Sequence, residues 1–141
     1  METVNRPKVT IQTTVNAPVN KVWQYWGAPE HITKWASPGG GWHTPRAEND
    51  LRTGGKFLSR MEAEDGSMGF DFGGVYDNVI PNELIEYTLG DGRRVITNFT
   101  VNGNEVEVVQ TFDAEDQNPV EFQRAGWQAI LDNFKKYTEA N

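Results

Sequence analysis

The stretch EFQRAGWQAILDNFKKY, residues Glu121 to Tyr137, decides the fold because its apolar side chains repeat with the period of a helix. The inward stripe consists of Trp127, Ile130, Leu131, Phe134 and Tyr137. Polar side chains such as Arg124 and Lys136 fall on the other side. This pattern predicts one long amphipathic helix that buries its stripe against the rest of the domain.

The chain begins with a pattern typical of one strand followed by two short helices. Residues Lys8 to Val15 alternate between apolar and polar side chains, which predicts a half-buried strand. The next apolar residues share one helical face: Val19, Val22, Trp23 and Trp26. We expect this helix to end at Gly27 and a second one to begin at Pro29, with Ile32 and Trp35 facing inward.

A series of short strands separated by turn signals follows, as in an antiparallel meander. The predicted strands are Trp42 to Glu48, which has the weakest pattern, then Lys56 to Glu64, Met68 to Val79, Glu83 to Leu89, Arg93 to Val101 and Glu105 to Asp113. Strands that are followed by a helix, rather than alternating with helices, favour an α+β fold. Because no linker or repeat interrupts the pattern, we expect a single domain over residues 1–141.

Composition narrows the functional classes. The chain of 141 residues has no cysteine, which excludes disulfide scaffolds, thiolate zinc sites and cysteine nucleophiles. With 20 acidic against 13 basic residues, its net charge of −7 argues against nucleic acid as a partner. It contains neither a secretory signal nor an apolar stretch long enough to span a membrane, so we expect a cytoplasmic protein.

Several short motifs resemble a known family over nearly the whole chain. They are Ala17-Pro18 with Val22-Trp23, Pro29-Glu30-His31 with Lys34-Trp35, Asp50 to Gly55, Gly74 to Pro81, and Gly126-Trp127 with Leu131. In this order they resemble the START-like helix-grip superfamily (SRPBCC), and within it the branch related to the activator of the heat-shock chaperone ATPase. The resemblance implies a curved antiparallel sheet of six or seven strands wrapped around the long C-terminal helix, with two short helices after the first strand. It implies no single activity, because members of the superfamily bind ligands, catalyse reactions or contact a chaperone.

The candidate site is an aromatic-lined pocket between the sheet and the long helix. The residues expected to face it are Trp42, Phe57, Arg60, Met61, Phe70, Phe72, Tyr76, Tyr87, Phe99, Trp127, Ile130 and Phe134. Two interpretations remain open: the rings form a solid core, or they surround a volume that takes a planar or acyl ligand, with Tyr76, Arg60 or Trp42 as polar contacts. Gly126 costs its helix about 1 kcal/mol relative to alanine, which indicates a closely packed strand or the pocket itself beside it.

Other chemistry finds little support in the sequence. His31 and His43 are too few for a zinc site, and the serines lie outside any nucleophile motif. Arg52 beside Asp50 has two interpretations, an anion clamp or a charge that fixes a loop, and we favour the second. We therefore expect no metal, no cofactor and no catalytic residue.

These observations favour a non-enzymatic protein that binds a hydrophobic small molecule, lipid-like or polyaromatic. The resemblance adds two alternatives: a module that contacts a heat-shock chaperone, and an enzyme similar to polyketide cyclases. We expect no nucleic-acid or membrane partner, and either a monomer or a homodimer.

Overall fold

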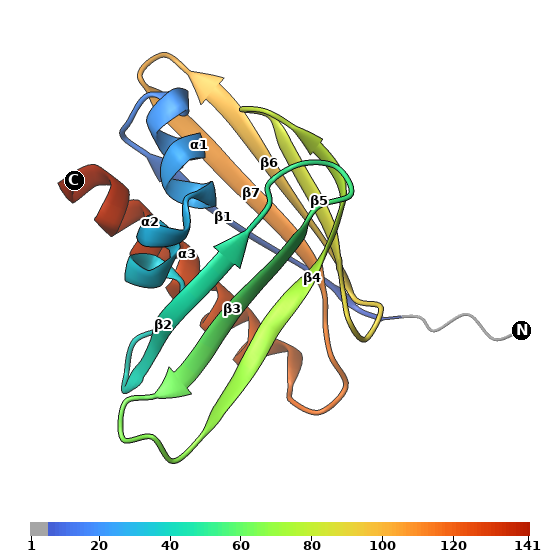
Figure 1. The fold of residues 1–141 in the computed structure, drawn as a ribbon. Helices are drawn as coiled ribbons and strands as arrows, with labels where there is room; N and C mark the ends of the chain where they lie inside the picture. Colours follow the sequence, from blue (N-terminus) through green and yellow to red (C-terminus); the bar gives the residue numbers. More distant parts are fainter. Residues whose placement is uncertain (1–5) are drawn as a thin grey trace, which may run out of the picture.

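The computed structural model describes residues 6–141, and its elements follow the predicted order (Figure 1). They are β1 (Lys8–Val15), α1 (Val19–Gly27), α2 (Pro29–Trp35), β2 (Trp42–Asn49), β3 (Lys56–Ala63), β4 (Gly69–Ile80), β5 (Leu84–Leu89), β6 (Arg94–Asn102), β7 (Glu105–Asp113) and α3 (Val120–Ala140). The predicted strand boundaries agree to within one or two residues. Even the weakest pattern, that of β2, forms a strand.

The strands form one seven-stranded antiparallel sheet in the order β1-β7-β6-β5-β4-β3-β2. From β2 to β7 each strand pairs with the next in sequence, and β1 adds to the far edge by pairing with β7 from Lys8↔Asp113 to Val15↔Val106. The sheet curls, and α3 lies across its concave side (Figure 1). The predicted α+β helix-grip fold is confirmed.

Turn residues end the strands where the sequence predicts. The hairpin between β6 and β7 contains Asn102-Gly103, and Gly103 has a φ of 65°, which glycine adopts without the steric cost that a Cβ brings. A bulge in β4 after Tyr76 shifts the alternation, so that Val79 rather than Asn78 packs against the core.

The filled part of the core lies under α1, α2 and the C-terminal half of α3. Helix α3 packs along β1, where Val9, Ile11 and Val15 alternate inward, and buries Leu131 and Phe134. In contrast, β2 is covered by α2. Because α3 packs along β1 at one edge of the sheet, strands β2 to β4 diverge from it at the other edge (Figure 1).

No helix within residues 6–141 is long and apolar enough to cross a membrane.

Candidate functional site

A cavity of about 670 Å³ occupies the space between α3 and the β3–β5 part of the sheet, with α2 and β2 at its side. Nine of the predicted residues line it: Trp42, Phe57, Met61, Phe70, Phe72, Tyr76, Tyr87, Trp127 and Ile130. Its volume falls in the range usual for sites that enclose small molecules. A volume surrounded by aromatic rings therefore remains open between the sheet and α3.

Aromatic rings fix the shape of this cavity by packing edge to face. Phe57 meets the ring of Tyr87 at 4.7 Å and 71° between their planes, and Phe72 meets that of Trp127 at 5.9 Å and 74°. Trp127 also stacks on Phe112, with ring centroids 4.1 Å apart. Such contacts hold each ring by its neighbours. The wall is thus preformed.

Two predicted pocket residues, Phe99 and Phe134, are buried in the filled core and do not line the cavity. The tryptophans of the short helices occupy the space in front of them: Trp26 meets Phe99 at 5.5 Å and Phe134 at 4.8 Å. Trp35 meets Phe134 at 4.9 Å. The rings therefore form a filled core in one half of the sheet and surround an open volume in the other half.

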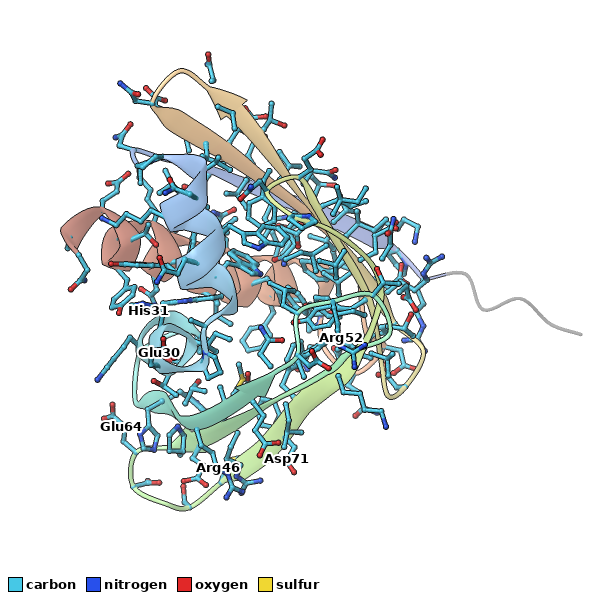
Figure 2. All side chains as sticks on the ribbon, turned by 45° about the horizontal axis from the view of Figure 1, so that its top comes forward. Glu30, His31, Arg46, Arg52, Glu64 and Asp71 are labelled. Carbon is cyan, nitrogen blue, oxygen red and sulfur yellow. The ribbon has the colours of Figure 1, made fainter. Side chains whose placement is uncertain are left out.

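The placement of Arg60 in the pocket was wrong. Phe57, Ser59 and Met61 of β3 line the cavity, so the alternation of the strand turns Arg60 to the opposite face. There its guanidinium pairs with Glu62 at 2.9 Å and with Asp71 at 3.4 Å. Figure 2 shows Asp71 on this outer side of the sheet.

Tyr76 lines the cavity, but its hydroxyl already has a partner. It donates to Asn49 Oδ1 at 2.5 Å, and the Asn49 amide donates to the Gly27 carbonyl at 2.7 Å. Burial raises the pKa of Tyr76 far above its ordinary value, so the hydroxyl stays protonated. This chain of hydrogen bonds ties the end of α1 to β2 and β4.

Tyr87, opposite Tyr76 in the sheet, is different. Its side chain is buried and lines the cavity, yet its hydroxyl has no hydrogen-bond partner among residues 6–141. The hydroxyl is also not among the fully enclosed atoms without a partner. Burial raises the pKa of Tyr87 strongly. A neutral O–H donor therefore faces the cavity.

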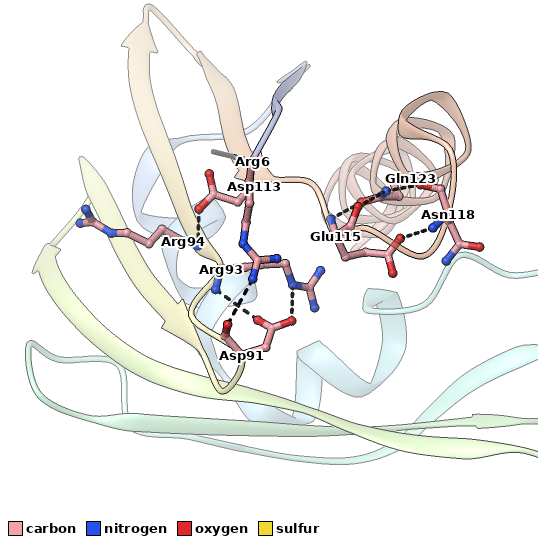
Figure 3. Close-up of polar contacts among 8 residues, drawn as sticks. All are labelled: Arg6, Asp91, Arg93, Arg94, Asp113, Glu115, Asn118 and Gln123. Carbon is pink, nitrogen blue, oxygen red and sulfur yellow. Dashed lines mark hydrogen bonds and ion pairs between the residues drawn. The ribbon is translucent and has the colours of Figure 1, made fainter. Parts of the chain in front are cut away.

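Several lining residues escaped the sequence reasoning, and four polar ones gather where β6 begins and α3 starts. They are Arg93, Glu115, Asn118 and Gln123. Gln123 accepts from the backbone N–H of Glu115 and donates to the carbonyls of Glu115 and Asn118, which fixes the loop 114–119 against α3 (Figure 3). The strand alternation in β6 could have found Arg93, because Val95 faces inward two residues later. No local pattern indicates the loop.

The mouth of the cavity carries exposed apolar side chains. Met68, Phe70 and Phe122 line it with 64%, 47% and 68% of their surface exposed. Phe122 projects from the first turn of α3, and Trp42 meets the Phe70 ring at 5.9 Å. Large apolar side chains on a surface often mark a contact site.

Gly126 leaves space in the wall of the cavity. Apart from the adjacent residues and the backbone of α3 itself, no atom lies within 4 Å of the position that a Cβ would take there. Of the two explanations that the sequence offered, a packed strand is thus excluded and the pocket remains.

The remaining candidates have structural roles. Arg52 Nε donates to the Asp50 carboxylate at 2.9 Å, which agrees with the loop-fixing interpretation. The imidazole of His31 stacks on Tyr25 at 3.9 Å and lies 2.6 Å from the Tyr137 hydroxyl, on the helical side of the molecule (Figure 2). His43 Nε2 lies 4.0 Å from Glu62 Oε1. No group of metal-ligating side chains occurs within the described part of the chain.

The curled sheet, the long helix across it and the cavity between them define a helix-grip domain of the ligand-binding type. The chain belongs to the family described as Activator of Hsp90 ATPase homolog 1-like protein, whose profile matches residues 16–139. A comparison with the curated proteins gives no match.

Solved structures from three organisms are similar over nearly the whole chain. An AHSA1-like protein from Aeromonas hydrophila is 39% identical, with a TM-score of 0.89 over 95% of this chain and 93% of that one. Protein Chr148 from Cytophaga hutchinsonii is 57% identical, with a TM-score of 0.80 over 95% and 93%. Protein CV1439 from Chromobacterium violaceum, 22% identical, shares the fold with a TM-score of 0.86 over 96% and 99%.

Proposed function

We propose that this protein binds a hydrophobic small molecule in the cavity between α3 and the sheet. The observation that supports this most directly is the aromatic wall around about 670 Å³ of open volume. Empty apolar volume is costly for a folded protein, because the atoms around it lose packing contacts. A bound apolar molecule restores those contacts and removes its own surface from water.

Gly126 supports the same proposal. A glycine in the middle of α3 costs the helix about 1 kcal/mol relative to alanine, and here no neighbouring atom requires it. The backbone of α3 borders the cavity at this position. We infer that the missing side chain leaves room for a ligand against the helix.

The test is a titration of isotope-labelled protein, followed by NMR, with a neutral two-ring compound such as 2-naphthol and a long-chain alcohol such as decanol. We expect shifts at Phe72 and Trp127. Gly126→Leu should place a side chain in the cavity beside Trp127 and abolish them by blocking the space that the ligand needs. The matched control is Ala125→Leu, which adds a similar side chain at the neighbouring exposed position. Binding that survives Gly126→Leu, or shifts with neither compound, would contradict the proposal.

A chaperone-contacting module is the second candidate, and the description of the family supports it. The exposed Met68, Phe70 and Phe122 would supply an apolar contact surface. An ATPase assay with the Hsp90-type chaperone of the same organism tests this role. No stimulation and no co-purification would reject it.

No contact among the described residues favours the third candidate, a cyclase-like enzyme. The cytoplasmic location and the single domain stay part of this proposal.

A further inference from the structure

Arg93 lies at the end of the cavity where β6 begins, together with Glu115, Asn118 and Gln123. Arg93 precedes β6, and its backbone carbonyl accepts from the N–H of Leu89 at the end of β5. Arg93 lies two residues before Val95, and Val95 pairs with Tyr87 of β5. On one face of an antiparallel pair, such diagonal neighbours are within reach of each other when the side chains are long. Arg93 and Tyr87 thus line the same cavity as neighbours.

The guanidinium of Arg93 is held in place but only partly used. Its Nε donates to Asp91 Oδ2 at 2.7 Å, and its backbone N–H donates to Asp91 Oδ1 at 3.1 Å. The side chain is 19% exposed. Its terminal N–H groups have no partner among residues 6–141. A fixed guanidinium with free donors is suited to receive a carboxylate.

Figure 3 shows how the two adjacent arginines differ. Arg93 extends toward α3 and the loop that carries Glu115, whereas Arg94 extends to the opposite side of the sheet. Arg94 is exposed and is absent from the cavity wall. The sheet therefore places one of these two charges in the cavity and the other in solvent.

The nearby carboxylates leave the terminal N–H groups of Arg93 available to a ligand. Asp91 binds its Nε edge and also lies beside Arg6, whose Nη2 donates to the Asp91 carbonyl at 3.4 Å. Glu115 lines the cavity, but its Oε1 accepts from the Asn118 N–H at 2.7 Å, and it forms no ion pair with Arg93 within the described residues. The O–H of Tyr87 adds a second donor.

We propose that the ligand is an apolar organic acid whose carboxylate binds Arg93 and Tyr87 while its hydrocarbon or aromatic body fills the ring-walled volume. This inference rests on the proposed function and names the ligand class for the same cavity. Arg93 supplies a charge-assisted donor and Tyr87 a neutral one. The apolar body packs against Phe57, Phe72 and Trp127. Glu115, at the same end, should weaken binding by repelling the acid.

The test compares naphthalene-2-carboxylate with naphthalene-2-carboxamide, which has the same rings and no charge. Isothermal titration of the wild-type protein should give an affinity about tenfold or more higher for the carboxylate, as expected for a hydrogen bond to a charged group. Arg93→Gln should remove this preference by weakening the carboxylate far more than the amide, and a circular dichroism spectrum like that of the wild type shows that the variant is folded. Tyr87→Phe should weaken the carboxylate by about threefold to tenfold.

Arg94→Gln is the matched control and should keep the full preference, and Glu115→Gln should increase it. Equal affinities for the two compounds in the wild-type protein, or a preference that survives Arg93→Gln, would overturn the acid-binding inference and leave the proposed function standing. If neither these compounds nor the neutral probes bind, both are wrong. Should Arg93→Gln fail to fold, the wild-type ratio and Glu115→Gln still decide.

Discussion

Trp127 touches both halves of the molecule with a single side chain. One face of its indole stacks on Phe112, which is buried in the sheet, and its surroundings on the cavity side include Phe72. It is partly exposed because the cavity borders it. This ring therefore belongs to the core and to the site at once.

We expect Trp127→Ala to lower the free energy of unfolding by about 3 kcal/mol, the lower end of the range for replacing a large aromatic ring. The stacking on Phe112 is lost, and the neighbouring cavity grows. Urea denaturation followed by far-UV circular dichroism measures this. A loss below about 1 kcal/mol would mean that the ring makes little contact in solution. Phe122→Ala, at an exposed position of α3, should change stability by less than about 0.5 kcal/mol.

At the scale of elements, α3 combines a tightly packed half with a half that borders empty volume. Leu131 and Phe134 are buried against the short helices and β1, whereas Phe122 is exposed and Gly126 borders the cavity. Gln123 fixes the start of the helix to the loop 114–119. One helix thus anchors the fold at its C-terminal end and shapes the site at its N-terminal end.

Gly126→Ala should raise the free energy of unfolding by up to about 1 kcal/mol, because alanine is the better helix former and its methyl group meets no atom. Chemical denaturation measures the effect. The contrasting variant is Gly55→Ala, whose Cβ would lie 2.0 Å from the Asp50 carbonyl oxygen. This second change should be strongly destabilising. If Gly126→Ala also destabilises, the space beside Gly126 is filled in solution.

The elements were predicted from the sequence because each one has a local signal. Alternation marks β1, helical spacing marks α3, and Asn102-Gly103 marks a hairpin. It was harder to assign which face of the sheet each side chain occupies. Ser59 lines the cavity, whereas the next residue, Arg60, lies on the opposite face of the sheet. The pocket residues were found where rings alternate along one strand, and Arg93 was missed because the search followed aromatic side chains.

The division of the core could not be predicted, because it depends on how elements far apart in sequence meet. Trp26 and Trp35 fill the space before Phe134, but nothing in the local pattern of α1 or α2 distinguishes rings that fill a core from rings that line a cavity. Trp26 and Trp35 in fact fill the core and also line the cavity.

At the scale of the whole molecule, the sheet is completed by β1, which joins the beginning of the described chain to β7. Lys8 pairs with Asp113 at 2.5 Å, and the other oxygen of Asp113 accepts from the Arg94 N–H at 2.9 Å. Lys8 and Asp113 are the first residue pair between β1 and β7. A carboxylate of β7 therefore contacts both neighbouring strands, β1 and β6.

Stability should consequently fall in acid. Burial opposes ionisation of Asp113, but the hydrogen bonds from Lys8 and Arg94 outweigh it, and the pKa of this carboxyl lies below its ordinary value. A lowered folded-state pKa contributes stability above the unfolded-state pKa, about 4, and this contribution is lost as the pH falls below it. Urea titrations between about pH 6 and pH 3 should show a smaller decline for Asp113→Asn than for the wild type. Asp116→Asn, at an exposed position, should keep the wild-type decline.

The separation of a filled half from an open half has a consequence for how this protein can change over time. Substitutions at Phe57, Phe72 or Ile130 alter the shape of the cavity, while the packing around Phe134 and Val9 remains. The shape of the cavity can therefore change while the packing of the filled half is kept. Two parts of one chain are thus open to change to different degrees.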